Sequence, residues 1–238
     1  MKGIISIVLI AMLAAIAYCK PIRNSLGAKG GEKGIRLPYD AEVEYLESTG
    51  TQYIDTGAVW DSVIASKMEM TVQYTQTGGR QVACGSGIAF YFGCNANRWE
   101  WRYGTYEGVV GTGVTTVAKE LTATNNSFYI NGTLVQSRTE NAAASWWGDS
   151  AYVFGMNSGG KLSLPSLARV FSFKAWIGGT LVRDMTPVRF TNEQGQSEGA
   201  MYDRLGVGGM NPDGTARTDG LYRNRGTGAF VIGPDKQH

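Results

Sequence analysis

Short runs of alternating polar and apolar side chains recur along this chain, and glycine-rich breaks separate them. The clearest pair of runs is 127–130 and 133–135, joined by Asn131-Gly132. Asn-Gly between two β-prone runs predicts a type I′ hairpin, because both central residues of that turn need a positive φ. No window of a dozen residues shows a helical period. The pattern therefore predicts antiparallel strands.

Other segments repeat this signal. In one of them Met68, Met70 and Val72 share one face, and polar residues share the other. Glycine makes up 33 of 238 residues, which suits a fold with many tight turns at positive φ. We predict an all-β fold, an antiparallel two-sheet β-sandwich. Further strands are expected at residues 64–74, 98–103, 168–177 and 180–184.

The start of the chain has a different composition. Residues 1–38 carry six Lys or Arg against one Glu, a formal charge of +5, whereas the remaining 200 residues carry −3. Residues 4–16 form an apolar run of 13 residues, shorter than the roughly 20 that span a bilayer. We expect a signal peptide at 1–17, a basic Gly-rich tether at 18–38 and a sandwich domain at 39–238.

Two other outcomes stay open for this leader: a lipoprotein acylated at Cys19, or an uncleaved anchor. Membrane contact is expected only through such a signal or lipid anchor. The predicted location is extracellular or at the cell surface, with the periplasm as another compartment.

The single histidine, His238, is the last residue. A domain with no internal histidine excludes Ser-His-Asp and Cys-His catalysis and His-ligated zinc. A mildly acidic body has no basic footprint for nucleic acid.

Cys84 and Cys94 are the only cysteines of the predicted domain. They flank residues 85–93, which are expected to form a hairpin. Two alternatives stay open: one disulfide, as an oxidising compartment permits, or two buried thiols whose geometry prevents a bond.

The order of several motifs resembles bacterial and phage proteins with a laminin-G-like, concanavalin A-like jelly roll. The resemblance spans residues 41–232 and implies the same sandwich, while family members bind sugars, proteins or no known ligand. Residues 206–220 are an insertion relative to that pattern and are expected to form an exposed loop. The motifs are 43–57, 128–135, 168–176, 179–189, 199–204 and 226–230.

This resemblance also implies a possible Ca²⁺ site at one rim, because laminin-G-like domains often hold that ion through oxygen ligands. The candidate ligands are Asp55, Asp61, Asp149 and Asn157.

Glu42, Glu44 and Glu47 resemble the acidic strand of some glycoside hydrolases on this fold. Glycoside hydrolysis needs two carboxylates flanking the bond. We favour the alternative that these are carboxylates on the outer face of a first strand, with no catalytic residue.

Aromatic residues are the leading ligand candidates, because sugar rings stack on them. Trp99, Trp101 and Tyr103 share one strand face, and Arg98, Glu100 and Arg102 share the other. The aromatic face forms either sandwich core or an exposed platform.

A second aromatic patch is Trp146-Trp147 beside Asp149. Adjacent residues of an extended chain point in opposite directions, so an exposed tryptophan is expected there.

The leading functional prediction is an exported, non-catalytic binding or adhesion module whose partner is a glycan or a cell-surface protein. Two alternatives are a self-associating surface, filament or phage-fibre subunit and a glycan-active hydrolase.

Overall fold

The computed structural model describes residues 37–59, 66–87, 90–104, 106–110, 113–139, 148–206 and 218–237, with only the backbone at 106 and 107. The predicted signal segment, Cys19 and residues 18–36 of the tether lie outside these ranges, as do Asp61 and residues 207–217 of the predicted loop. No helix in the described ranges is long and apolar enough to cross a membrane.

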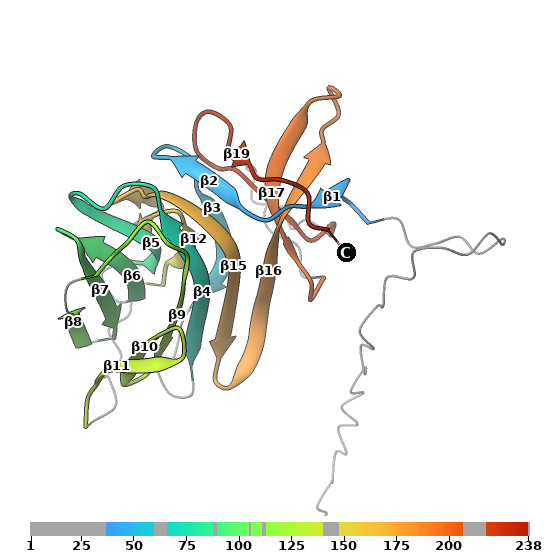
Figure 1. Ribbon diagram of the computed structural model, residues 1–238. Helices are drawn as coiled ribbons and strands as arrows, with labels where there is room; N and C mark the ends of the chain where they lie inside the picture. The colour runs from blue at the N-terminus through green and yellow to red at the C-terminus, as the bar shows by residue number, and fades with distance from the viewer. Residues whose placement is uncertain are drawn as a thin grey trace, which may run out of the picture. The chain divides into compact units, whose positions relative to one another are not determined.

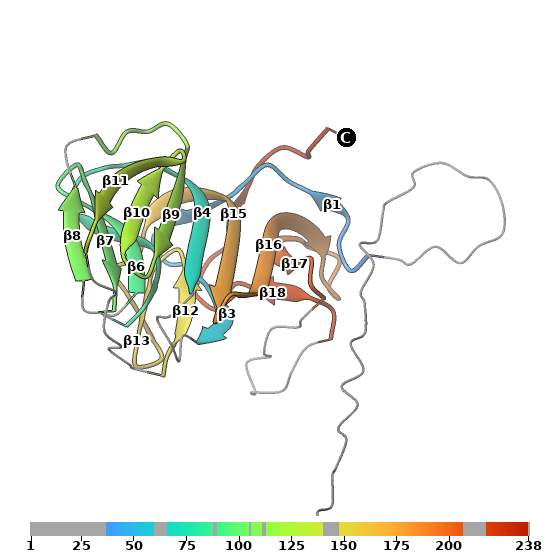
Figure 2. The same cartoon turned by 90° about the horizontal axis from the view of Figure 1, so that it is seen from below.

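The strands form two sheets, called here the large sheet and the small sheet (Figures 1 and 2). The main path of the large sheet runs through β11 (Thr133–Ser137), β10 (Ser127–Ile130), β9 (Lys119–Thr124), β4 (Lys67–Tyr74), β15 (Leu167–Ile177), β16 (Thr180–Thr191), β17 (Ser197–Asp203) and β18 (Leu221–Arg223). Beside this path β1 (Ala41–Glu42) pairs with β16, β2 (Leu46–Thr49) with β15, and β19 (Val231–Ile232) with β2.

The small sheet runs through β14 (Lys161–Ser163), β13 (Met156–Ser158), β5 (Arg80–Ser86), β6 (Phe90–Asn95), β7 (Arg98–Tyr103) and β8 (Tyr106–Val110). The strand β12 (Ser150–Val153) pairs with both β5 and β3 (Ile54–Val59). The named strands pair antiparallel, except for a two-residue parallel pairing of β13 with β5. The predicted all-β, two-sheet sandwich is confirmed.

The core lies between the two sheets and follows from the alternation of the sequence. In β4 the side chains of Met68, Met70 and Val72 are buried, and the residues between them are partly exposed. Since directly opposed residues of paired strands share a face, Phe173 of β15 and Leu121 of β9, both opposite Met70, continue this buried layer. Period-two burial in paired strands therefore builds one apolar interior.

The predicted hairpin is confirmed. Asn131 (φ 50°) and Gly132 (φ 73°) both have positive φ, as a type I′ turn requires. Ile130 lies opposite Thr133, so β10 and β11 are joined by these two residues alone. The Asn131 side-chain oxygen also accepts a hydrogen bond from the backbone N–H of Glu120 at 3.0 Å. The turn is thereby tied to the next strand of the large sheet.

Of the two alternatives for Cys84 and Cys94, the structure has the one without a disulfide. Cys84 and Cys94 lie on the paired strands β5 and β6, and both are buried free thiols. Cys84 lies opposite Phe92, whereas Cys94 lies opposite Gln81. The two cysteines are thus offset along the hairpin instead of facing each other. Disulfide geometry needs the two Cβ atoms about 4 Å apart, so the alternative of two unbonded core residues is correct.

The aromatic face of β7 is core. Trp99 is 4% exposed, and Trp101 and Tyr103 are fully buried. The Trp101 ring stacks on Phe128 of the large sheet with centroids 5.6 Å apart and planes 8° apart. Its indole N–H donates to Gln136 Oε1 at 2.6 Å. The prediction of a ligand platform on these three residues is therefore wrong, because their rings are inaccessible to a sugar.

Candidate functional site on the outer face of the small sheet

The opposite face of β7 points away from the core and carries charged side chains. The two-residue turn of Ala96 and Asn97, with φ of 48° and 64°, joins β6 to β7 and sets Asn95 opposite Arg98. Arg80 of β5 lies opposite Asn95 from the other side. Because opposed residues share a face, Arg80, Asn95 and Arg98 form one cross-strand row.

Two further rows continue this outer face along the same strands. Gly93 of β6 lies between Val82 of β5 and Glu100 of β7. Tyr91, two residues earlier in β6, lies opposite Arg102. Residues far apart in the sequence are therefore brought together by the register of three strands.

Arg80, Tyr91 and Glu100 form a hydrogen-bonded network across β5, β6 and β7. Arg80 donates from Nε to Glu100 Oε2 at 2.9 Å and from Nη2 to Glu100 Oε1 at 2.7 Å. Arg80 Nη2 also donates to the Tyr91 hydroxyl oxygen at 3.0 Å, and that hydroxyl donates to Glu100 Oε1 at 3.2 Å. Two parallel N–H to oxygen bonds of this kind fix the plane of the guanidinium.

The burial of this network is asymmetric. Glu100 is 2% exposed although it points away from the core, while the side chain of Arg80 is 42% exposed. Removing a carboxylate from water costs several kcal/mol, which the charged hydrogen bonds offset. A threonine or valine in place of Glu100 would avoid the cost of removing a carboxylate from water. The effect of the buried carboxylate is to hold a solvent-facing guanidinium in one orientation.

Gly93 allows β5 and β6 to approach closely beside the network. It lies opposite Val82 of β5 and Glu100 of β7. A Cβ at Gly93 would lie 2.7 Å from the backbone oxygen of Gln81, too close for any real contact. Any larger residue would therefore move the backbone of β5 or β6.

A small apolar cluster borders the network. Val82, Tyr91 and Met156 are buried together on this side of the small sheet, with Leu164 packed against them. The Tyr91 ring thus packs in the apolar cluster while its hydroxyl joins the charged network. The three residues of the cluster are buried, so it supports the network from one side and is not itself a ligand surface.

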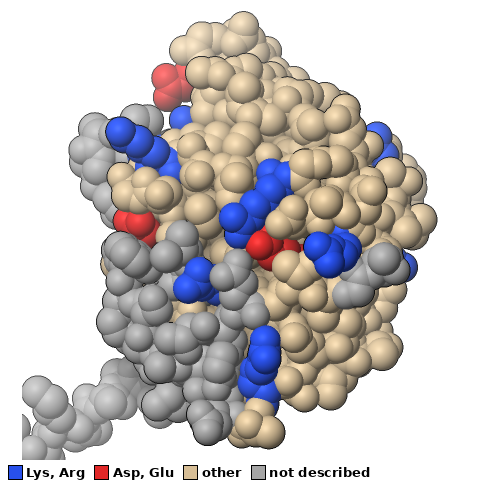
Figure 3. All heavy atoms as spheres, turned by 90° about the vertical axis from the view of Figure 1, so that its left-hand side faces the viewer, with Lys and Arg blue, Asp and Glu red and all other residues tan. Residues whose placement is uncertain are grey.

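Figure 3 shows the side of the molecule that lies at the left of Figure 1, where β7 and β8 are found. Among the described charged side chains on this side, Lys and Arg predominate over Asp and Glu. This differs from the predicted domain as a whole, whose formal charge is −3 after residue 38.

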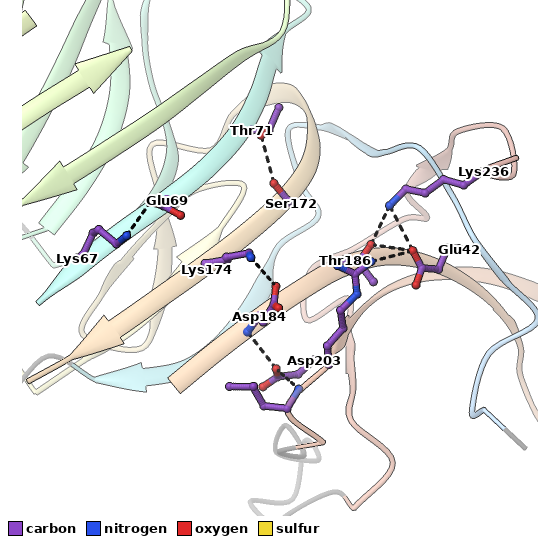
Figure 4. A network of polar contacts seen from close by, with 12 residues as sticks. Glu42, Lys67, Glu69, Thr71, Ser172, Lys174, Asp184, Thr186, Asp203 and Lys236 are labelled. Atoms are coloured by element: carbon purple, nitrogen blue, oxygen red, sulfur yellow. Dashed lines mark hydrogen bonds and ion pairs between the residues drawn. The ribbon is translucent and has the colours of Figure 1, made fainter. Parts of the chain in front are cut away.

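The outer face of the large sheet is arranged differently, because its charges neutralise each other locally. Figure 4 shows two of its contacts, Lys67 with Glu69 at 2.8 Å and Lys174 with Asp184 at 3.5 Å. Lys67 Nζ also lies 3.8 Å from the centre of the Trp176 ring. Partly exposed pairs of this kind contribute little to stability.

The large sheet also carries a trio with the same three residue types. Arg169 Nε donates to Glu47 Oε2 at 2.6 Å, and its guanidinium lies 4.6 Å from the centre of the Tyr45 ring. Here the Glu47 side chain is 19% exposed and accepts one hydrogen bond from the arginine, without the second parallel bond that Glu100 makes. This trio is a natural internal control for the first.

The three acidic residues considered for glycoside hydrolysis are separated by the fold. Glu42 belongs to β1 and Glu47 to β2, and Glu44 between them is exposed. Glu42 accepts from Arg204 at 3.0 Å, and Lys236 lies 3.4 Å from the same oxygen (Figure 4). Partial burial raises the pKa of Glu42, but the nearby charges of Arg204 and Lys236 lower it by more. The pKa of Glu42 is therefore below its usual value.

Three residues of the predicted calcium rim do come together. Ser150 donates to Asp55 Oδ1, and Asn157 Nδ2 donates to the Ser150 carbonyl at 2.9 Å. Asp149 Oδ2 accepts from the backbone N–H of Gly159 at 2.8 Å.

The carboxylate oxygens of Asp55 and Asp149 therefore accept hydrogen bonds from neighbouring O–H and N–H groups. Within the described ranges no group of three or more His, Cys, Asp or Glu could hold a metal ion. The described donors do not fit an oxygen cage for Ca²⁺. Asp61 lies outside the described residues, and calcium binding stays a prediction.

The second aromatic patch, Trp146 and Trp147, lies outside the described residues. The chain resumes at Gly148 and Asp149, beside β12. A ligand contact by either tryptophan stays a prediction.

No protein-family model matches the sequence, and no curated protein matches it. Among solved structures, one match is described as a "putative carbohydrate binding protein" from Bacteroides ovatus, with 12% identity and a TM-score of 0.44. The match covers 67% of this chain and 58% of that one, so this chain spans less than two thirds of its length. We assign no ligand or activity from so distant a match. Membership of the laminin-G-like, concanavalin A-like family stays a prediction.

Two members of the network, Arg80 and Tyr91, were not predicted from the sequence as site residues. The signal for the third was present, because Glu100 is an acidic residue in a strictly alternating aromatic strand. From the sequence, the aromatic side of that alternation is either core or a ligand platform; in the structure it is core, and the charged side carries the network.

Proposed function

We propose that this protein is a non-catalytic binding module for glycans and that Arg80, held by Glu100 and Tyr91, makes the central ligand contact. The observation that carries the proposal is the buried carboxylate of Glu100. Its burial has a desolvation cost, and its hydrogen bonds orient the partly exposed guanidinium of Arg80. Nε and Nη2 of this guanidinium are held by Glu100 and Tyr91, and its fixed, partly exposed positive charge suits a hydroxyl or a carboxylate of a sugar.

The neighbouring row supports this proposal. Asn95 is half-buried and Arg98 is exposed, and both lie on the same face as Arg80. Neighbouring strands are about 4.8 Å apart, so the backbones of Arg80 and Arg98 are about 10 Å apart.

We propose a binding role rather than a glycosidase role because the acidic residues of the first strands do not suit the chemistry. A general acid needs a raised pKa, whereas the pKa of Glu42 is lowered. Glu47 is held in an ion pair with Arg169.

We also propose that the protein is exported and acts at the cell surface, as the apolar run at residues 4–16 suggests. Mass spectrometry of the N-terminus of protein from the extracellular fraction tests this. Cleavage near Ala17 supports export as a soluble protein, and an intact Met1 contradicts cleavage.

A glycan array tests the binding role, run with and without Ca²⁺ so that the calcium prediction is tested at the same time. The best glycan is then titrated against the wild type, Arg80→Ala and the matched control Arg169→Ala. A charged hydrogen bond contributes about 1.5–3 kcal/mol, so Arg80→Ala is expected to weaken binding by roughly ten- to a hundredfold. Arg169→Ala should bind like the wild type. Equal effects of the two variants, or no glycan bound by the wild type, would contradict the proposal.

A further inference from the structure

We propose that the face around Arg80 selects glycans that carry carboxylates, such as polymers of uronic acids, over neutral glycans. The site is the one proposed above for glycans, so this ligand class rests on that proposed function. Two properties of the outer face of the small sheet support a carboxylate: its formal charge and the kind of hydrogen-bonding groups that it exposes.

The three cross-strand rows of this face carry a positive formal charge. Their charged residues are three arginines against two glutamates, although the predicted domain as a whole has a charge of −3. Glu100 is paired with Arg80, and Glu107 lies opposite Arg102 in the pairing of β7 with β8. Arg98 is exposed, and within the described ranges no ion pair joins it to a carboxylate. The charge that remains attracts anions, and Lys and Arg predominate on this side of the molecule (Figure 3).

The carboxylate of Glu100 does not compete with an incoming anion. It is 2% exposed, whereas the side chain of Arg80 is 42% exposed. Oε1 of Glu100 accepts from Arg80 and Tyr91, and Oε2 accepts from Arg80. A ligand in solvent therefore meets the guanidinium, while both oxygens of the carboxylate are engaged within the network.

The hydrogen-bonding groups of this face also suit a carboxylate. An arginine side chain has donors and no acceptor, and an ionised carboxylate has acceptors and no donor. A hydroxyl both donates and accepts, so a site for a neutral sugar also needs acceptor groups. Asn95, between Arg80 and Arg98, is the one neutral amide that the strand pairings place in these rows. Two donor-only side chains flank it, so this row complements a group that only accepts.

The face offers no aromatic ring on which a neutral sugar could stack. Among the described side chains of the three rows, Tyr91 is the only aromatic one, and it is 1% exposed. The other aromatic side chains of β7 lie in the core. Binding energy at this face therefore has to come from charge and hydrogen bonds, which favours a charged ligand.

Titration of acidic oligosaccharides and their neutral methyl esters tests this ligand class. Oligomers of galacturonate, glucuronate and mannuronate are each compared with the methyl-esterified form, which keeps the sugar and removes the charge. At least one acid should bind roughly tenfold more tightly than its ester, because charged hydrogen bonds are stronger than neutral ones. Added salt should weaken binding of the acid and leave binding of the ester unchanged.

A matched pair of variants tests whether the charge of this face is responsible. Arg98→Gln removes one exposed charge and keeps a hydrogen-bonding side chain. It should weaken binding of the acid by roughly two- to fivefold, the size of an exposed ion pair, and leave binding of the ester unchanged. Arg169→Gln, on the large sheet, is the control and should bind both ligands like the wild type.

An ester that binds as tightly as its acid, or a wild type that binds neutral glycans and none of the acids, would overturn the carboxylate preference. Neutral binding that Arg80→Ala weakens would still support the proposed binding function, so the two proposals fail separately. Equal effects of Arg98→Gln and Arg169→Gln on the acid would overturn the assignment to this face. A wild type that binds no glycan, acidic or neutral, would contradict both proposals.

Discussion

The two faces of β7 differ in what their side chains do. On the inner face, Trp101 and its neighbours lie in the core and stack against the large sheet. On the outer face, Glu100 is also buried, yet it lies there as the partner of a half-exposed arginine. Aromatic residues in a sandwich strand are therefore first explained by packing. A buried charge on the outward face has no packing explanation, and it is the better indicator of a binding site.

The largest expected difference between the faces is in stability. Trp101→Ala removes a fully buried ring and should cost about 3–5 kcal/mol of unfolding free energy. Arg98→Ala, on an exposed outward position of the same strand, should change stability by no more than about 0.5 kcal/mol. Denaturant unfolding of both variants measures this. A comparable loss in the two would contradict the assignment of faces.

Gly93 is the next test, because it lies beside the outer network. Gly93→Val should cost about 1–3 kcal/mol, since the new side chain meets the backbone oxygen of Gln81. Gly78→Ala is the control, because a Cβ there meets no atom within 4 Å. Thermal unfolding of both variants should separate them clearly. A fully stable Gly93→Val would contradict the close approach of β5 and β6 at this position.

The two Arg-Glu-Tyr trios provide a finer comparison. Glu100→Gln removes a buried charge with two bonds to arginine and should cost about 1.5–3 kcal/mol. Glu47→Gln, in a partly exposed pair, should cost no more than about 1 kcal/mol. Added salt should reduce the stability cost of Glu47→Gln but not that of Glu100→Gln, because exposed ion pairs are screened and buried ones are not. Equal costs at low salt would remove the distinction between the trios.

The smallest expected effect is on thiol reactivity at Cys84 and Cys94, which lie on the inner face of the small sheet. Burial raises the pKa of Cys94 to about 11, and Cys84 is shifted in the same direction. A raised folded-state pKa keeps the thiol protonated below that pH, so native protein should not react with iodoacetamide at pH 8. The denatured control should react at both cysteines. Mass spectrometry that finds either cysteine labelled in native protein would contradict their burial.

Local patterns predicted the sandwich class and the positions of β4, β7, β10, β11, β15 and the start of β16. Period-two alternation located β4 and β7, and Asn131-Gly132 located the hairpin, because strand and turn preferences act over a few residues. The register between β5 and β6 was not predictable in this way, since a bulge between Val82 and Cys84 shifts it. That register decides that the cysteines do not face each other.

The candidate site escaped prediction for the same reason. Arg80 and Glu100 are 20 positions apart and meet only through two strand pairings. The alternation of β7 separated an aromatic face from a charged one, but it contained no information that Glu100 meets Arg80 and Tyr91.

A crystal structure of the protein with its best-binding glycan would test the central claim most directly. The account predicts that the sugar lies on the outer face of the small sheet, with hydroxyl or carboxylate oxygens within hydrogen-bond distance of the Arg80 guanidinium and the ring near Arg98. A sugar bound instead at Trp146 and Trp147, or beside Arg169 on the large sheet, would contradict it.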